Sequence, residues 1–284
     1  MKLSKFDYAS PTTIKEVVDL LSRNEGRARV IAGGQSLIPM LAFRLTQASI
    51  LIDLRRVPGL DGIVISGQGV HLGAKVRWHD IETSAELAAA HPLLTAAIKH
   101  VAHHQIRTRG TVGGSLAHAD PAAELPCLAV LCDAEIDIFG SSGARRVSAT
   151  SFFTGPLTTV LDMDELVTGM RLPYWPAERR WAFEEFSRRR GDFALAGVGL
   201  FFDVQKGAAK NAHVAAFGIG DTPVRLARAE TALNGRALRE ACIDDCCKAA
   251  QSDIEPRDDI NGSSTYRRSL INHLLAKALR HSIA

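Results

Sequence analysis

The chain has 284 residues, 46% of them hydrophobic, so it can bury a large core, and its length favours two domains over one. Its 34 basic and 31 acidic residues leave a formal net charge of only +3, and the basic residues are dispersed, which argues against nucleic acid as a partner. No apolar run approaches the roughly 20 residues that span a bilayer, and residues 1–11 lack the apolar core of a signal peptide. We therefore expect a cytoplasmic protein without a transmembrane segment.

The first part of the chain predicts a small α/β unit followed by a change of pattern. Thr12 or Thr13 can cap the first helix, and an extended run leads into a glycine-containing segment. In chain order, the pattern predicts a helix at 14–21, an extended run at 29–31, a strand at 50–54, short β runs at 62–65 and 69–72 with a hairpin turn between them, and helices at 81–89 and 93–101.

The second part predicts further helices and strands on both sides of a proline pair. Pro173 and Pro176 read as the start of a new unit. The expected elements are an Ala-rich stretch compatible with a helix at 121–131, strands near 134–139, at 194–204 and at 213–219, and helices at 227–233, 241–250 and 266–280. With no internal repeat, the pattern predicts an α+β protein in two parts.

The cysteines and a histidine cluster do not suggest metal sites. The five cysteines form no CxxC pair and have no spacing typical of zinc or an iron–sulfur cluster, so we expect reduced thiols packed on helices. His100, His103 and His104 lie close in sequence, but adjacent histidines point to different faces of a helix. We expect no metal in this chain.

Two glycine-containing segments carry most of the functional signal. They are Ala32-Gly33-Gly34-Gln35-Ser36 and Thr111-Val112-Gly113-Gly114-Ser115. Glycine lets consecutive backbone N–H groups approach an anion, so two such segments could hold the phosphates of a dinucleotide from opposite sides. A glycine pair alone is weak evidence, because tight turns also use glycine for conformational reasons. The chain contains neither GxGxxG nor GxxxxGK[ST], which disfavours the Rossmann and Walker interpretations.

The residues around these segments resemble a known family. The matching stretches are residues 32–39, AGGQSLIP; 105–115, QIRTRGTVGGS; 118–126, HADPAAELP; 188–194, RRRGDFA; 222–225, TPVR; and 258–268, DDINGSSTYRR. Together they closely resemble the FAD-binding medium subunit of molybdenum hydroxylases of the carbon monoxide dehydrogenase and xanthine dehydrogenase type. The resemblance spans nearly the whole chain.

The resemblance implies both the architecture and the division of the chain. The expected fold class is α+β, with a PCMH-type FAD-binding region at residues 1–175 made of two α/β subdomains, at about 1–55 and 56–175. Residues 176–284 are expected to form a C-terminal α+β domain like that of the carbon monoxide dehydrogenase flavoprotein, closing over the flavin.

The resemblance also implies the cofactor contacts. One side of the FAD diphosphate is expected to lie against Val30, Ile31, Ala32, Gly33, Gly34, Gln35, Ser36 and Leu37. The other side is expected to lie against Thr111, Gly113, Gly114 and Ser115.

Asp120 matches a family carboxylate near the adenosine half, and it is also a candidate helix N-cap before Pro121. Leu166, Val167 and Ala102 are expected at the flavin, although such apolar residues are also typical of a core. Phe193 is expected over the isoalloxazine, with an ordinary core phenylalanine as the alternative.

Three departures from relatives bear on redox chemistry. Some relatives have a lysine where this chain has Glu184 and Glu185, and some have a phenylalanine where it has Val101. Because of these two differences, the resemblance does not settle the isoalloxazine contacts or any NAD-linked activity. A cysteine-rich insertion that holds a further cluster in some relatives is absent after Pro121, so FAD is expected to be the only redox cofactor of this chain.

The implied function is electron transfer within a complex. Substrate is expected to react at molybdopterin on a large subunit, and electrons to cross [2Fe-2S] clusters on a small subunit to reach this FAD, in a dimer of heterotrimers. No arrangement typical of a nucleophile or a paired-carboxylate catalyst is present, so we assign no catalytic residue. The competing hypotheses are a stand-alone FAD-dependent oxidoreductase and an assembly or scaffold subunit without flavin.

Substitution of either glycine segment tests this interpretation. Gly33→Val or Gly114→Val is expected to release the cofactor while leaving much of the fold, because a Cβ would obstruct the approach of phosphate. The measurement is flavin content per chain after purification. Unchanged flavin stoichiometry in both variants would contradict the assignment.

Overall fold

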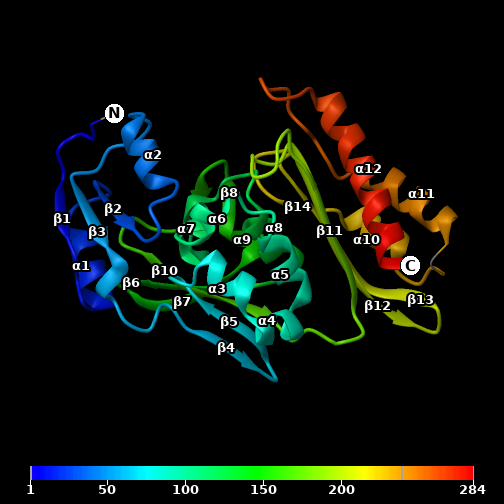
Figure 1. Ribbon diagram of the computed structural model, residues 1–284, viewed down its shortest axis with the longest axis horizontal. Coiled ribbons are helices and arrows are strands. Elements are labelled where there is room, and N and C mark those ends of the chain that lie inside the picture. The colour runs from blue at the N-terminus through cyan, green and yellow to red at the C-terminus, as the bar shows by residue number, and fades with distance from the viewer. Residues whose placement is uncertain (1, 238, 284) are drawn as a thin grey trace.

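The computed structural model describes residues 2–237 and 239–283, which form three main sheets flanked by helices (Figure 1). The N-terminal sheet is parallel, in the order β1 (Asp7–Ala9), β3 (Ile50–Asp53), β2 (Ala28–Ile31). Helix α1 (Ile14–Arg23) begins where the Thr13 hydroxyl accepts the N–H of Glu16 at 3.2 Å. It buries one apolar face, and α2 (Leu37–Ala42) follows β2 directly after the first glycine segment.

The middle sheet is antiparallel and its last strand in sequence lies at its centre. The order is β4 (Ile63–Ser66), β5 (Gly69–Gly73), β10 (Leu166–Pro173), β6 (Glu135–Gly140), β7 (Gly143–Ser148). Its flanking elements are η1 (Leu54–Arg56), α3 (Trp78–Thr83), α4 (Ala85–Ala90), α5 (Pro92–Ile98), α6 (His104–Arg107), α7 (Val112–His118), α8 (Glu124–Leu131), α9 (Ala149–Phe152) and the small pair β8 (Phe153–Gly155) and β9 (Thr158–Thr159).

The C-terminal sheet lies between two sets of helices (Figure 1). It contains β11 (Arg180–Phe186), β12 (Ala196–Gln205), β13 (Ala208–Phe217) and β14 (Val224–Arg225), all antiparallel. One face packs against α10 (Ala227–Leu233) and α12 (Ser264–Ile283), which α11 (Glu240–Ala250) joins from outside, and the other face packs against α5 and α8. Alternate side chains of a strand point to opposite faces, so Phe201 joins the middle core while Leu200 and Phe202 join the C-terminal core.

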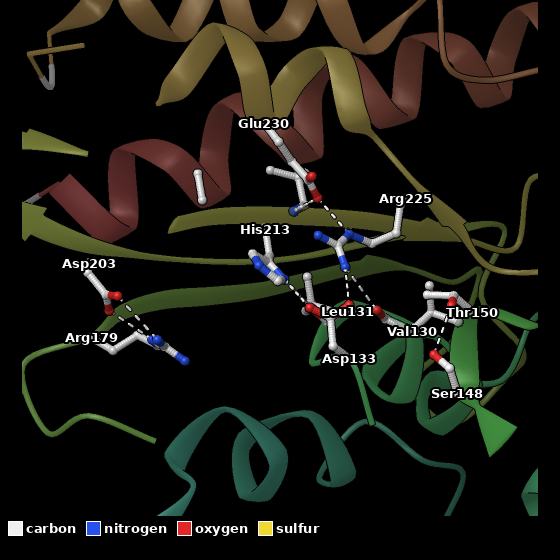
Figure 2. Close-up of polar contacts among 12 residues, drawn as sticks. Val130, Leu131, Asp133, Ser148, Thr150, Arg179, Asp203, His213, Arg225 and Glu230 are labelled. Carbon is white, nitrogen blue, oxygen red and sulfur yellow. Dashed lines mark hydrogen bonds and ion pairs between the residues drawn. The ribbon is translucent and has the colours of Figure 1, made fainter. Parts of the chain in front are cut away.

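Helix α8 joins the middle of the chain to the C-terminal sheet. All eight of its residues are buried, which is the pattern of a helix covered on every side. The carbonyls at a helix C-terminus lack partners within the helix, and here those of Val130 and Leu131 contact side chains of that sheet. Figure 2 shows the Arg225 guanidinium donating to the carbonyl of Val130 at 3.2 Å and to Asp133 at 2.7 Å, and pairing with Glu230 at 2.6 Å. His213 Nδ1 lies 3.0 Å from the carbonyl oxygen of Leu131.

The α+β fold class predicted from the sequence is confirmed, and most elements fall near their expected places. Among the described residues, seven strands were not predicted, namely β1, β7, β8, β9, β10, β11 and β14. In β10 residues on both faces are buried, and in β11 the consecutive charges Glu184 and Glu185 interrupt the apolar alternation. Strand β7 is mostly polar and exposed. Within the described residues, no helix has the length and apolar character needed to cross a bilayer.

Replacing Arg225 tests the junction between α8 and the C-terminal sheet. Arg225→Met is expected to lower the free energy of unfolding by about 3 kcal/mol, because it removes the ion pairs with the partly buried Glu230 and with Asp133 and the hydrogen bond to the Val130 carbonyl. Arg146→Met, which removes an exposed pair with Glu135 and Asp137 on β6, is expected to cost less than about 1 kcal/mol. Urea unfolding measures both, and equal losses would refute the role of the junction.

Candidate functional site

A cavity of about 650 Å³ lies where the N-terminal sheet, the middle sheet and the loop after β11 meet. This volume is within the range of ligand sites, roughly 300–1,000 Å³. Every residue predicted from the sequence to contact a cofactor lines it except Ile31, whose side chain packs behind Gly34 instead. The predicted residues on the wall are Val30, Ala32, Gly33, Gly34, Gln35, Ser36, Leu37, Ala102, Thr111, Gly113, Gly114, Ser115, Asp120, Leu166, Val167 and Phe193.

The first glycine segment presents free backbone donors to the cavity. It connects β2 to α2 and turns at Gly34, whose φ of +73° is in the left-handed region that favours glycine. Within residues 2–237 and 239–283, the N–H groups of Gly33, Gly34, Gln35 and Ser36 have no protein acceptor. Ser36 also makes no side-chain capping bond to α2. Consecutive free N–H groups in a turn suit an anion such as a phosphate.

The second glycine segment is built differently from the prediction. It forms the start of α7, and its N–H groups are used within the protein. Val112 donates to the carbonyl of Val76 at 3.0 Å, Gly113 to that of Ala74 at 2.8 Å, and Gly114 to the Thr111 hydroxyl at 3.2 Å. The expectation of a second nest of free amides was therefore wrong. This segment contributes the exposed Gly114 backbone and the Ser115 hydroxyl to the wall.

The first segment packs against Arg109 and Gly110, which directly precede the second segment, so the two segments lie at one cavity. A Cβ on Gly33 would collide with the backbone carbonyl of Arg109, and a Cβ on Gly113 would collide with Ala74. These glycines therefore permit close packing of the backbone rather than the approach of a ligand. Gly33→Val would force the backbone at Arg109 to shift. The expectation that this variant leaves much of the fold in place stays a prediction. At Gly114 only the Thr111 hydroxyl lies near the added Cβ, so that variant remains a direct test of the cavity.

Two alternative interpretations from the sequence are also corrected. Asp120 is not the N-cap of α8, because that helix begins at Glu124 after Ala123, and Asp120 instead accepts the N–H of Ala122 at 2.9 Å. Phe193 is not a core residue, because 72% of its surface is exposed where it borders the cavity. Leu166 and Val167, at the start of β10, are both buried and on the wall.

Glu124 was not predicted to lie in the site. It is the only charged residue of α8, is 9% exposed, and lines the cavity. Burial, with a smaller contribution from the nearby Asp120 charge, raises the pKa of its carboxyl to about 7. A single acid in an otherwise apolar helix was the sequence signal for this residue. A carboxyl buried at a cavity wall is typical of a functional site.

Glu185 is a second buried acid, and it is not on the cavity wall. Its side chain is 5% exposed, and its Oε2 has no hydrogen-bond partner among the described residues. Burial, with a smaller contribution from the charge of Glu124, raises the pKa of Glu185 to about 8. Nδ1 of His100 lies 3.9 Å from this carboxyl. The preceding Glu184 points to the opposite face of β11 and pairs with Lys277 at 2.8 Å.

The three clustered histidines have separate surroundings. His100 faces Glu185, and the ring of His103 packs against Gly191 beside the cavity. His104 lies near His79 and Glu82, with their potential metal-ligating atoms within 4.8 Å of one another. Both oxygens of Glu82 are bound by Arg107, at 2.9 and 3.1 Å. The only carboxylate of that group is therefore already paired with a cation.

Comparison with known protein families shows to which family this chain belongs. The family described as "FAD binding domain in molybdopterin dehydrogenase" matches residues 4–175, and "CO dehydrogenase flavoprotein C-terminal domain" matches residues 181–282. This chain belongs to the FAD-binding subunit family of molybdopterin dehydrogenases. The resemblance stated from the sequence motifs is therefore confirmed.

Relatives in this family match over almost their full length. The chain is 37% identical to the nicotine 6-hydroxylase medium subunit of Paenarthrobacter nicotinovorans, over 98% of each chain. It superposes with a TM-score of 0.97 and 34% identity on a carbon monoxide dehydrogenase structure from Hydrogenophaga pseudoflava, covering 100% and 99% of the two chains. For quinoline 2-oxidoreductase from Pseudomonas putida 86 the TM-score is 0.94, with 37% identity and coverage of 99% and 98%.

The raised pKa of Glu185 predicts a pH-dependent stability. Folding favours the protonated carboxyl, so its stabilising contribution is complete below the usual pKa of 4.5 and is lost as pH rises towards about 8. Between these limits the free energy of unfolding of the natural chain is expected to fall by on the order of 3 kcal/mol more than that of Glu185→Gln. Denaturant unfolding across this range measures the difference, with Glu184→Gln as the control. Parallel pH profiles for the natural chain and Glu185→Gln would contradict the burial argument.

Proposed function

We propose that the cavity binds FAD, with the diphosphate against the free N–H groups of the first glycine segment. The proposal depends on one observation: the backbone N–H groups of residues 33–36 have no protein acceptor among the described residues, and they lie on the same cavity wall as Gly114 and Ser115. The walls suit the rest of the cofactor. Leu166, Val167 and Ala102 supply apolar surface, and the exposed ring of Phe193 is available to stack on a planar heterocycle. The residues proposed to bind FAD are those predicted from the sequence, with Glu124 added and Ile31 in a supporting position.

Bound FAD would supply the ability to take up single electrons and release them in pairs. This chain's residues hold the cofactor, orient it and exclude water from part of it. The family's role is that of a medium, electron-transferring subunit in a dehydrogenase or hydroxylase complex. We propose that the partners are a large subunit with molybdopterin and a small subunit with [2Fe-2S] clusters, in a dimer of heterotrimers located in the cytoplasm.

We further propose that the chain divides as predicted, into subdomains at about 1–55 and 56–175 and a C-terminal domain at 176–284. The parallel sheet, the central antiparallel sheet and the sheet beneath α10, α11 and α12 support this division, as do the family matches at 4–175 and 181–282. In this arrangement the cavity lies at the junction of the three units, because the loop around Phe193 follows β11.

Flavin content and the role of Phe193 test the proposed function. The purified complex is expected to carry about one FAD per copy of this chain, as measured by acid release and absorbance. Phe193→Ala is expected to weaken FAD binding by up to about tenfold, the equivalent of one aromatic stacking contact, with little effect on stability because the ring is exposed. Tyr174→Ala removes another exposed ring outside the cavity and is the matched control.

Two outcomes would contradict the proposal. A colourless complex would favour an assembly or scaffold subunit. Flavin-dependent oxidation of an organic substrate by this chain alone, without partner subunits, would favour a stand-alone oxidoreductase.

A further inference from the structure

A second cavity, of about 730 Å³, borders the proposed flavin cavity. The two cavities share four wall residues, namely Asp120, Gly191, Asp192 and Phe193. The volume of the second cavity is also within the range of small-molecule sites, roughly 300–1,000 Å³. A ligand in it would therefore lie next to the occupant of the first cavity, and the exposed ring of Phe193 borders both spaces.

The walls of the second cavity are joined to one another by hydrogen bonds. They come from four chain segments, at residues 120–122, 188–195, 218–221 and 257–261. Arg267, which is 5% exposed, donates to the carbonyls of Leu195 and Gly218. It also pairs with Asp259 at 2.7 Å, and the N–H of Gly218 donates to the carbonyl of Pro121 at 2.9 Å. The second cavity is therefore a preformed part of the fold.

Backbone donors without a protein acceptor lie on its wall. Within residues 2–237 and 239–283, the N–H groups of Ala194 and Ile219 have no acceptor, although both residues are buried. The N–H groups of Gly220 and Asp221, which follow Ile219, have none either. Buried N–H groups are almost always hydrogen-bonded, so free ones on a cavity wall favour a ligand with acceptor atoms. Such a ligand can be bound from two separate segments of the wall.

The charge of this wall disfavours an anionic ligand. In the described part of the chain, five aspartates and three arginines line the second cavity. Two of the arginines are already in ion pairs, Arg267 with Asp259 and Arg257 with Asp221. The third, Arg188, donates to a backbone carbonyl of the 257–261 segment. A dinucleotide, with its two charged phosphates, would be repelled by the surplus of carboxylates, whereas an uncharged ligand would not.

The remaining wall is apolar and suits a flat ring. Pro121, Ala122, Leu195 and Ile219 contribute aliphatic surface, and Phe193 contributes an exposed aromatic ring. Aromatic side chains stack on planar ring systems, and aliphatic surface gains free energy when a ring covers it. The second cavity therefore combines apolar surface, free N–H donors and negative charge.

We propose that the second cavity binds a quinone, which accepts electrons from the proposed flavin. An uncharged ring with two carbonyl oxygens fits the apolar surface, the free donors and the charge of the wall. This inference rests on the proposed function, because it requires FAD in the first cavity. The quinone takes up two electrons and two protons, so its two carbonyls become hydroxyls. The reduced flavin loses the same two electrons and two protons and returns to its oxidised form.

Binding of menadione, a small uncharged quinone, tests the second cavity without turnover. The purified complex is expected to bind about one menadione per copy of this chain in equilibrium dialysis. A Cβ at Gly220 would meet no atom within 4 Å, and the backbone there is outside the left-handed region. Gly220→Trp is therefore expected to fill part of the cavity and to lower the affinity for menadione at least about tenfold. Its FAD content is expected to be unchanged, because Gly220 is not on the wall of the first cavity.

Gly62→Trp is the matched control for this variant. Gly62 is exposed, lies on the wall of neither cavity, and also has open space where a Cβ would be added. Its affinity for menadione is expected to stay within about twofold of the natural complex, as for a surface substitution. The rate at which menadione reoxidises the reduced flavin is expected to fall in Gly220→Trp and to stay unchanged in Gly62→Trp.

Asp192→Asn tests the argument from charge. The probe is 1,4-naphthoquinone-2-sulfonate, which has the same ring system as menadione and one negative charge. At low salt this probe is expected to bind more weakly than menadione. Asp192→Asn is expected to strengthen its binding about threefold, the effect of removing one like charge about 6 Å away in water, and to leave menadione binding within about twofold. A purely structural role of Asp192 would change the binding of both quinones equally.

The outcomes distinguish this inference from the proposed function. Full FAD content without menadione binding, or equal menadione binding in Gly220→Trp and the natural complex, would refute only the quinone site. Loss of FAD from Gly220→Trp would refute the separation of the two cavities. Binding of NAD⁺ that Gly220→Trp abolishes would refute an uncharged acceptor. A natural complex without FAD would refute the proposed function, and with it this inference.

Discussion

The close approach of Gly33 to the backbone of Arg109 constrains the shape of the site. The first glycine segment follows a parallel sheet, and the residues that it meets, Arg109 and Gly110, directly precede the second segment. The first segment leaves its amides free, whereas the second uses its amides to bond with Ala74 and Val76, the residues that follow β5. A larger residue at Gly33 would push against Arg109, and a larger residue at Gly113 would push against Ala74.

Helix α8 is the second element on which the site depends. Its N-terminal end supplies Glu124 to the cavity wall, and its C-terminal end is bound by Arg225 and His213 from the C-terminal sheet. The helix therefore fixes the position of that sheet relative to the cavity. Phe193 belongs to the C-terminal part, so its place beside the cavity depends on the same helix.

The sequence predicted the fold class and most of the helices, and all but one of the cofactor contacts that it implied lie on the cavity wall. The predictions succeeded for motif residues whose type fits a role at a cofactor, such as the turn at Gly34, the hydroxyl of Ser115 and the ring of Phe193. They failed where long-range packing decides the outcome. For example, the N–H group of Gly113 is hydrogen-bonded to the carbonyl of Ala74, a residue outside the motif. The burial of Glu185 depends on helices far away in the chain, which local periodicity does not describe, and β10 is recognisable only beside its neighbours β5 and β6.

The central place of β10 has a consequence for how the molecule folds. Strands β5 and β6 are not neighbours, because β5 pairs with one edge of β10 and β6 with the other. The middle sheet therefore cannot close until residues 166–173 have left the ribosome, although β4 and β5 are made about a hundred residues earlier. Such non-local pairing slows folding and leaves strand edges open in the meantime. The N-terminal parallel sheet lies wholly within the first 53 residues and is free of this delay. The sheets beside the two glycine segments are therefore expected to form at very different times during synthesis.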